Sequence, residues 1–341
     1  MRYIIFGAGA VGGAIGARLA DAGHTVILVC RGDHLAAIRR DGLLLRTPDR
    51  AIRVRVPAVS APAEIDFDDD DVVFLTMKSH DTTPALEALE RAAGDVPVIC
   101  AQNGVANERM AARRFSRVYA MNVHLPATFF DPGVVDAYGV PVTGVLDCGR
   151  FPRGVDPLIQ RVAADLASSG FLSRAVEDIM RLKYAKLLIN LTNGLEAIVG
   201  EIPPGGGSVG AALRDEAAAV FRAAGIDWAS EEEMRERILR HYRYGEIPGA
   251  PRRHGSSTWQ SLAKGRSRLE VDYLNGEICL LGMLHGIPTP RNAAIRQLAQ
   301  QMASQGKPPG ASTLPELEAM LANWPHLHGP EPTDEGAMRV R

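Results

Sequence analysis

Three glycines near the start of the chain have the spacing with which a backbone can hold a phosphate group. Segment 7–12 reads Gly-Ala-Gly-Ala-Val-Gly and directly follows the apolar run at residues 2–6. In such a turn the first glycine permits the tight bend, the second lets backbone approach a pyrophosphate, and the third lets the next helix pack closely on the strand. The helix N-terminus then offers free N–H groups and the positive end of its dipole. We therefore expect a dinucleotide site formed by Gly7, Ala8, Gly9, Ala10, Val11 and Gly12.

The residues around these glycines supply the context that the short pattern needs, because glycines also gather in ordinary turns. Apolar residues with helical spacing run from Val11 to Ala22 and stop at Gly23. The β-branched run 25–29 follows and predicts a second strand. Together these segments make a strand–helix–strand unit of about 30 residues, the length that such a unit requires.

The end of the second predicted strand bears on which dinucleotide is bound. An NAD site usually carries an Asp or Glu there, which holds the ribose 2′-OH. This chain has Arg31 instead, and a guanidinium can make a bidentate contact with a 2′-phosphate. Asp33 lies a little further on and could serve an NAD ribose if the loop folds back. We therefore expect NADP(H), with NAD as the alternative.

A second group of polar residues lies on an otherwise apolar helical segment in the second half of the chain. At about 100° per residue, Lys186, Asn190 and Asn193 fall within roughly 60° of one another. The rest of the circumference is apolar and carries Leu187, Leu188, Ile189, Leu191 and Leu195. A helix of this kind is buried, so its polar stripe must face a cavity or a partner. The alternative is a surface position with Lys183 and Lys186 in water.

Two further polar residues follow predicted strands of the first half. Lys78 comes soon after the apolar run 72–75, and Asn103 comes soon after the run 96–100. Ligands of parallel sheets lie at the carboxyl ends of the strands. We therefore expect both side chains where a nicotinamide and its substrate would lie, and a plain surface lysine is the alternative for Lys78.

The bulk composition excludes several classes of protein. The 341 residues carry a formal net charge of −2, so nothing marks the chain as a nucleic-acid binder. No apolar run is long enough to cross a membrane, and the first strand begins at residue 2, which leaves no room for a signal peptide. The four cysteines are far apart, as in a reduced cytoplasmic protein. The acidic run 66–71 is typical of a solvated turn, and we expect no metal site.

The order of predicted elements indicates an α/β fold. Strands and helices alternate through the first half, which predicts a Rossmann-type doubly wound sheet at residues 1–175. From residue 176 the chain is mostly helical, which predicts an all-helical C-terminal domain at 176–322. Beyond that, Pro, His and Gly increase and periodicity stops, so we expect a disordered tail at 323–341.

Taken together, these features resemble the ketopantoate reductase (2-dehydropantoate 2-reductase) family over roughly residues 2 to 300. The resemblance rests on the order and spacing of several short segments: 7–12, 30–32, Lys78, 102–104, 186–190, 257–260 and 269–276. It implies an N-terminal Rossmann domain, a C-terminal helical domain and NADPH-dependent reduction of the 2-keto group of ketopantoate to pantoate. It also implies a small 2-keto acid as the ligand, and we expect a possible homodimer.

The resemblance further implies a role for each matched side chain. Lys186 would be the general acid that protonates the alkoxide formed when a hydride reaches the keto carbon. Glu270 would hold the substrate hydroxyl and orient this lysine, although an exposed ion pair with Arg266 is the alternative. Substrate binding would fall to Asn103, Asn190, Asn193 and Ser257, and the nicotinamide end would be lined by Lys78 and Asn103.

Two departures from the family pattern put the substrate in doubt. A second asparagine is usual four residues after the position of Asn190, whereas this chain has Gly194 there and an asparagine at Asn193. The stretch 131–138 also differs from the usual glycine-rich hairpin. Two other functions therefore stay open: an opine or 3-hydroxyacid dehydrogenase of the same plan, and a non-catalytic NADP(H)-sensing module.

Overall fold

The computed structural model describes residues 1–322 and 324, and the chain divides into two compact units. The sheet unit comprises residues 1–190 and 226–254, and the helical unit comprises 191–225 and the described residues from 255 onward. Helix α6 (Ile179–Asn190) thus belongs to the sheet unit, and segment 226–254 returns to it. These units differ in their limits from the predicted ranges 1–175 and 176–322, and the predicted tail lies outside the described residues apart from Trp324.

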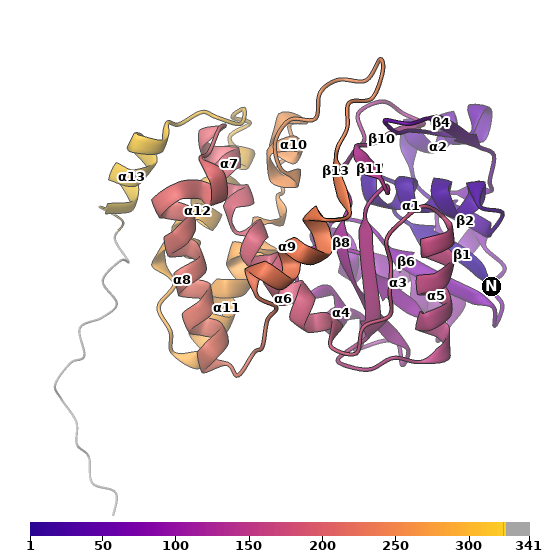
Figure 1. The fold of residues 1–341 in the computed structure, drawn as a ribbon, viewed down its shortest axis with the longest axis horizontal. Helices are drawn as coiled ribbons and strands as arrows, with labels where there is room; N and C mark the ends of the chain where they lie inside the picture. The colour runs from indigo at the N-terminus through magenta and orange to yellow at the C-terminus, as the bar shows by residue number, and fades with distance from the viewer. Residues whose placement is uncertain (323, 325–341) are drawn as a thin grey trace, which may run out of the picture. The chain divides into compact units, whose positions relative to one another are not determined.

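Among the described residues, the sheet unit is built on a seven-stranded sheet with the order β12-β8-β7-β6-β1-β2-β5 (Figure 1). All neighbouring strands pair in parallel except β12, which runs antiparallel to β8. The strands are β1 (Arg2–Phe6), β2 (Thr25–Val29), β5 (Ala58–Val59), β6 (Asp71–Leu75), β7 (Val98–Cys100), β8 (Val118–His124) and β12 (Val145–Arg150). The carboxyl ends of β1, β6, β7 and β8 therefore share one edge of the sheet.

Two smaller sheets accompany it in the described part of the chain. One has the order β4-β3-β10-β9, and the other pairs β11 with β13. Their strands are β3 (Leu43–Arg46), β4 (Ala51–Val54), β9 (Ala127–Thr128), β10 (Val134–Ala137), β11 (Gly139–Pro141) and β13 (Tyr242–Tyr244). The β11–β13 pair joins the first half of the chain to the returning segment.

The helices of the sheet unit cover the sheet and connect its strands. They are α1 (Ala10–Asp21), α2 (Gly32–Asp41), α3 (Thr82–Ala93), α4 (Asn107–Ala111), α5 (Pro157–Ser168), α6 and α9 (Glu231–Leu239), with short 3₁₀ turns η1 (Pro62–Glu64) and η2 (Ser79–Asp81). Helices α6 and α9 pack together through Ile179, Leu182 and Met234.

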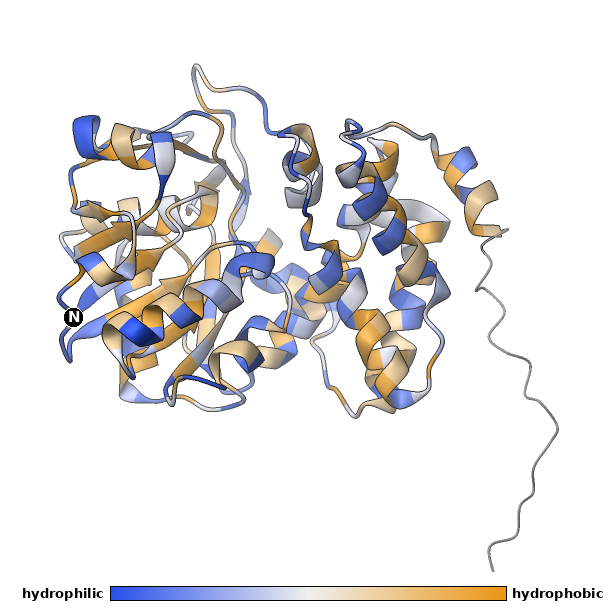
Figure 2. Ribbon diagram, turned by 180° about the vertical axis from the view of Figure 1, so that it is seen from behind, coloured by the Kyte–Doolittle hydropathy of each residue, from blue (hydrophilic) through white to orange (hydrophobic). Residues whose placement is uncertain are grey.

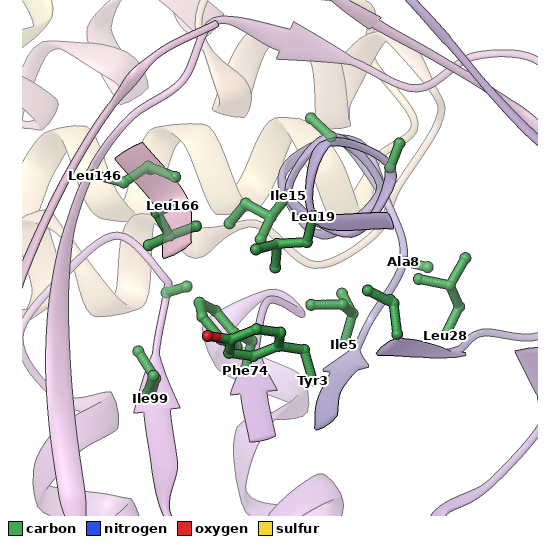
Figure 3. Packing of buried hydrophobic residues seen from close by; sticks show 14 of the residues in the cluster. Tyr3, Ile5, Ala8, Ile15, Leu19, Leu28, Phe74, Ile99, Leu146 and Leu166 are labelled. Atoms are coloured by element: carbon green, nitrogen blue, oxygen red, sulfur yellow. The ribbon is translucent and has the colours of Figure 1, made fainter. Parts of the chain in front are cut away.

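The core of the sheet unit lies on both faces of the large sheet, because successive side chains of a strand point to opposite sides. On one face Tyr3 and Ile5 of β1 pack with Phe74, and α1 contributes Ile15 and Leu19 (Figure 3). On the other face the strands form a second apolar cluster against α3. Figure 2 shows the strands coloured mostly hydrophobic and the helices of mixed colour, as expected for elements with one buried side.

The helical unit contains α7 (Thr192–Val199), α8 (Gly207–Ala223), α10 (Ser257–Ala263), α11 (Asn275–His285), α12 (Pro290–Ser304) and α13 (Leu314–Ala322), with 3₁₀ turns η3 (Pro204–Gly206) and η4 (Glu270–Tyr273). Two buried asparagines connect its helices. Asn275 donates to the Leu191 carbonyl at 3.1 Å and to Asn292 Oδ1 at 3.1 Å. Asn292 in turn donates to Glu216 Oε2 of α8 at 2.9 Å.

The fold class predicted from the sequence is confirmed, but one prediction of local structure is wrong. The sequence spacing predicts the polar stripe on one continuous helix, whereas α6 ends at Asn190 and α7 begins at Thr192. Asn193 therefore belongs to the helical unit, while Lys186 and Asn190 belong to the sheet unit. The described helices include none that is both long enough and apolar enough to cross a membrane.

Candidate active site

The glycine-rich turn joins β1 to α1 at the carboxyl edge of the sheet. Gly7 has φ +108°, and a Cβ there would lie 2.8 Å from the Met77 nitrogen. At Gly12 a Cβ would collide with the Gly7 carbonyl and with Thr76 Oγ1, which itself donates to the Gly7 oxygen at 2.8 Å. At Gly9, which precedes α1, a Cβ would meet no atom within 4 Å. Two glycines thus permit close packing, and the third leaves the approach to the helix N-terminus open.

A histidine that sequence analysis missed fixes this turn. His34 of α2 is buried, and its Nε2 lies 2.7 Å from the Ala8 carbonyl. The Gly133 N–H donates to Nδ1 at 2.9 Å, so Nε2 carries the proton and donates to Ala8. Burial lowers the pKa of His34, which favours this neutral form. The side chain therefore holds the turn to the loop before β10.

Arg31 occupies the N-cap position of α2, two residues after the end of β2. Its backbone is extended, with φ −137°, and its side chain is exposed. The guanidinium has no hydrogen-bond or ion-pair partner within the described residues. Asp33, the alternative contact for a ribose, is also exposed in the first turn of α2. Both side chains are available to a ligand, and only the arginine suits a phosphate.

The loops after β6 and β7 carry Lys78 and Asn103, both half-buried. Gln102 ties the two loops together, because its Nε2 donates to the Met77 carbonyl at 2.9 Å. Asn107 of α4 donates to the Asn103 carbonyl at 3.1 Å and fixes the second loop. The structure therefore places Lys78 and Asn103 on the same edge as the glycine turn, as the strand order requires.

Lys183 of α6 has a closed set of partners. Its Nζ lies 2.6 Å from Glu108 Oε1 and donates to the carbonyls of Gln102 at 2.9 Å and Met121 at 3.3 Å. Lys183 is only 3% exposed and Glu108 is fully buried. A surface position for this lysine is therefore wrong, and the ion pair fastens α6 to the carboxyl edge of the sheet.

Lys186, about one turn further along α6, has a different environment. Its Nζ lies 3.2 Å from Nδ1 of His124, the last residue of β8. Burial, and then the charge of Lys186, hold the pKa of His124 well below its usual range, so the neutral ring accepts a hydrogen bond from the Lys186 ammonium at Nδ1. Burial and the nearby positive charge of Arg253 lower the pKa of Lys186 to about 8. An ammonium with this pKa can give up a proton near neutral pH.

Several buried polar atoms on β8 and at the end of α6 lack a hydrogen bond within the described residues. They are His124 Nε2, Asn122 Oδ1 and Asn190 Nδ2. Asn190 is 4% exposed and ends α6. Because buried polar groups are nearly always satisfied, such a cluster indicates a place where a ligand supplies the missing partners.

The helical unit carries the other predicted side chains. Ser257 begins α10, and its Oγ is buried with no hydrogen bond within the described chain. Glu270 begins η4 and is 5% exposed, while Arg266 is exposed and makes no ion pair with a described residue. The alternative of a surface Glu270–Arg266 pair is therefore wrong. Asn193 is half-buried, and its carbonyl accepts from Ser256 Oγ at 3.4 Å.

Comparison with known proteins now decides the family. The family model described as "Ketopantoate reductase PanE/ApbA" matches residues 3–151, and its C-terminal counterpart matches 178–303. A 2-dehydropantoate 2-reductase of Archaeoglobus fulgidus is 31% identical over 311 residues, 89% of this chain and 98% of the relative. The chain belongs to the ketopantoate reductase family. It is accordingly an oxidoreductase that acts on a keto or hydroxyl group.

Other members of the ketopantoate reductase family agree in length and in fold. A 2-dehydropantoate 2-reductase of Pyrococcus horikoshii is 27% identical over 90% of this chain and 99% of the relative. The crystal structure of a PanE/ApbA family ketopantoate reductase from Ralstonia eutropha JMP134 superposes with a TM-score of 0.74 at 30% identity, covering 90% and 99% of the two chains. The comparison therefore extends over both units.

Within this family, the departure at Gly194 has a physical reason in the structure. A Cβ at Gly194 would lie 2.8 Å from Cγ2 of Ile295 and 3.3 Å from Cγ1 of Val271. A side chain at this position of α7 would therefore collide with α12 and η4. The helical unit of this chain is packed for a glycine there, and no asparagine fits without displacement of Ile295.

Sequence reasoning missed three residues of the site in the sheet unit: His34, His124 and Arg253. Each contacts or influences a predicted residue from an element far away in the sequence. A weak indication of His124 was present in the sequence, because this residue ends an apolar strand and ligands of parallel sheets lie at the carboxyl ends of their strands. No group of three or more metal-ligating side chains occurs in the described chain, and Asp71 of the acidic run pairs with Arg2 at 2.6 Å.

Proposed function

We propose that the chain reduces ketopantoate, a 2-keto acid, to pantoate with NADPH. The observation that carries this proposal is the position of Lys186 beside neutral His124 at the end of β8, on the edge where the glycine turn also opens. The names of the relatives from Archaeoglobus fulgidus and Pyrococcus horikoshii support the choice of substrate.

The residues present fit a dinucleotide. The open backbone at Gly9 and the first turn of α1 would hold the pyrophosphate, with Ala8, Ala10 and Val11 flanking it. Arg31, exposed and without a partner in the described chain, would take the 2′-phosphate. The bound cofactor would supply a hydride to the keto carbon.

Lys186 would then act on the keto oxygen. As the carbon accepts the hydride, the electron pair of the C=O bond moves to oxygen, and the Nζ–H bond of Lys186 breaks to protonate it. His124 accepts a hydrogen bond from the same ammonium, which fixes the direction of the lysine. After turnover Lys186 is neutral and regains a proton from solvent.

The remaining predicted residues would bind the substrate. Asn190 and Ser257 have buried polar atoms that need partners, and Glu270 is a buried carboxylate suited to hold the product hydroxyl. Asn103 and Lys78 would line the nicotinamide end, and Asn193 would contribute near Ser257. A cytoplasmic location and a homodimer stay predictions from the sequence.

A substrate panel tests the reaction. Consumption of the reduced cofactor should be fastest with ketopantoate and NADPH, slower with NADH, and absent with 3-keto acids or with a keto acid plus an amino acid. If a 3-keto acid is turned over in preference to ketopantoate, the chain is a 3-hydroxyacid dehydrogenase instead. If a keto acid plus an amino acid is preferred, it is an opine dehydrogenase.

The role of Glu270 needs a separate test. Glu270→Gln removes the charge and keeps the shape, so turnover of ketopantoate should fall while NADPH still binds. The losses from Glu270→Gln and Lys186→Met should not add in the double variant, because residues that act as a unit lose most of their effect at the first change. Asp272→Asn is the matched control, since Asp272 lies on the same turn η4 and, within the described residues, pairs with Arg296 at 3.1 Å. Additive losses would contradict the role.

A further inference from the structure

The sheet unit contains a recess that the proposed roles do not use. It has a volume of about 620 Å³ and is lined by Tyr138 and by the loop after β13, chiefly Tyr244, Ile247, Pro251, Arg252 and Arg253. The loop is held in place by the main chain, because the Gly245 N–H donates to the Tyr138 carbonyl at 2.8 Å. Tyr138 OH also donates to the Pro251 carbonyl at 3.0 Å.

Arg253 is the unusual residue of this wall. Its Nε is buried without a hydrogen bond in the described chain, and its guanidinium carbon lies 5.6 Å from the centre of the Tyr244 ring. No described carboxylate forms an ion pair with it. Its neighbour Arg252 differs, because the side chain is 82% exposed and lies 3.8 Å from Glu246. A partly desolvated guanidinium without an ion-pair partner favours an anionic ligand.

Three acids of the sheet unit have other cations as partners, and one of them, Glu246, also lines the recess and lies 3.8 Å from Arg252. Asp136 of β10 forms a bidentate pair with Arg46 at 2.6 and 2.9 Å. Glu108 pairs with Lys183. The positive charge of Arg253 reaches Lys186, whose pKa it lowers. Arg253 and Lys186 therefore influence each other, and neither forms an ion pair with a carboxylate of the described chain.

In a 2-keto acid the carboxylate carbon is bonded directly to the keto carbon. A group that binds the carboxylate must therefore be a neighbour of the group that protonates the keto oxygen. We propose that Arg253, at the wall of this recess, binds the substrate carboxylate and determines the preference of the enzyme for 2-keto acids over neutral ketones. This proposal rests on the proposed function, since it takes Lys186 as the proton donor.

The experiment compares ketopantoate with its neutral primary amide in steady-state reduction by NADPH. Arg253→Met should lower kcat/KM for ketopantoate by about 10- to 100-fold, as for the loss of a charge-assisted hydrogen bond, through a higher KM. The same variant should change kcat/KM for the amide by less than about threefold. Arg253→Lys should recover part of the loss with ketopantoate.

Arg252→Met is the matched control, because Arg252 lines the same recess but is exposed and paired with Glu246. It should change kcat/KM for either compound by less than about threefold. An Arg253→Met loss that is equal for acid and amide, or no larger than the loss in Arg252→Met, overturns the proposal and leaves the proposed function standing.

Failure of the proposed function has a different signature. If the wild type reduces neither compound, the carboxylate site is judged by calorimetry with pantoate. Binding of pantoate that is lost in Arg253→Met and kept in Arg252→Met upholds an anion site, and equal binding in the two variants overturns it.

Discussion

Lys183 and Lys186 lie about one turn apart on α6, and they differ in the partners of their ammonium groups. Around Lys183, an ion pair with Glu108 and two backbone carbonyls use every proton of the ammonium. Lys186 instead has a neutral histidine as its hydrogen-bond partner within the described residues, and a second cation, Arg253, acts on it. Buried atoms of His124 and Asn190 near it have no partner in the described chain.

The comparison separates a structural lysine from a chemical one. The ammonium of Lys183 already has three partners, one of them a carboxylate, so a ligand would add little to it. A desolvated ammonium among unsatisfied groups is less stable by itself, and a bound substrate supplies what it lacks. Replacement of Lys183 by methionine should therefore lower stability, whereas the same replacement of Lys186 should lower turnover.

The largest effect is expected on stability at Lys183. Lys183→Met leaves Glu108 buried and unpaired, which should lower the free energy of unfolding by about 3–5 kcal/mol. The measurement is urea unfolding of the full chain. The double variant Lys183→Met/Glu108→Leu removes the orphaned charge and should recover much of the loss. A Lys183→Met protein as stable as the wild type would contradict the structural role.

The next effect is on turnover at Lys186. Lys186→Met should lower kcat by about 10²-fold or more, the scale of a positioned acid, with unfolding changed by less than about 1 kcal/mol. Steady-state kinetics with ketopantoate and the same urea unfolding measure both quantities. If folded Lys183→Met loses the turnover and Lys186→Met keeps it, the two roles have been assigned the wrong way round.

The pH profile sharpens the comparison. Lys186 must be protonated to donate, and burial with the charge of Arg253 lowers its pKa to about 8. The kcat/KM should therefore be level below that pH and fall about tenfold per unit above it. His124 stays neutral in this range, because its pKa is held well below its usual value. Arg253→Met removes a positive charge and should move the falling limb to higher pH.

A limb near the ordinary lysine value of 10.5 would contradict the lowered pKa of Lys186. In Lys186→Met, the residual kcat/KM should not show this fall at high pH.

Local sequence patterns are enough to predict the parts of the candidate site that lie on neighbouring residues. The glycine turn and the run 2–6 are contiguous, so strand, turn and helix follow from neighbouring residues. The same holds for Lys186 and Asn190 on one face of α6. The end of α6 could not be predicted, because the nearest glycine, Gly194, lies inside α7 and does not mark the break between the two helices.

The partners of the two lysines could not be predicted, because they come from other elements. Lys183 pairs with Glu108 of α4, and Lys186 contacts His124 of β8. Nothing in the spacing of α6 tells which of two lysines meets an acid. The return of segment 226–254, which brings Arg253 into the sheet unit, is likewise a tertiary property.

Arg31 extends the comparison to a third cation, which is exposed and has no partner in the described chain. If its partner is the 2′-phosphate, Arg31→Ala should weaken NADPH binding about tenfold, or about 1.4 kcal/mol, and leave NADH nearly unchanged. Fluorescence titration with each cofactor measures this. Arg40→Ala is the matched control, because Arg40 lies on the adjoining helix α2 but pairs with Asp41 at 2.7 Å. Stability should not change in either variant, since Arg31 has no partner in the described chain and an exposed ion pair such as Arg40–Asp41 contributes little. Equal losses for both cofactors in Arg31→Ala would remove the basis for NADPH preference and return Asp33 as the ribose contact.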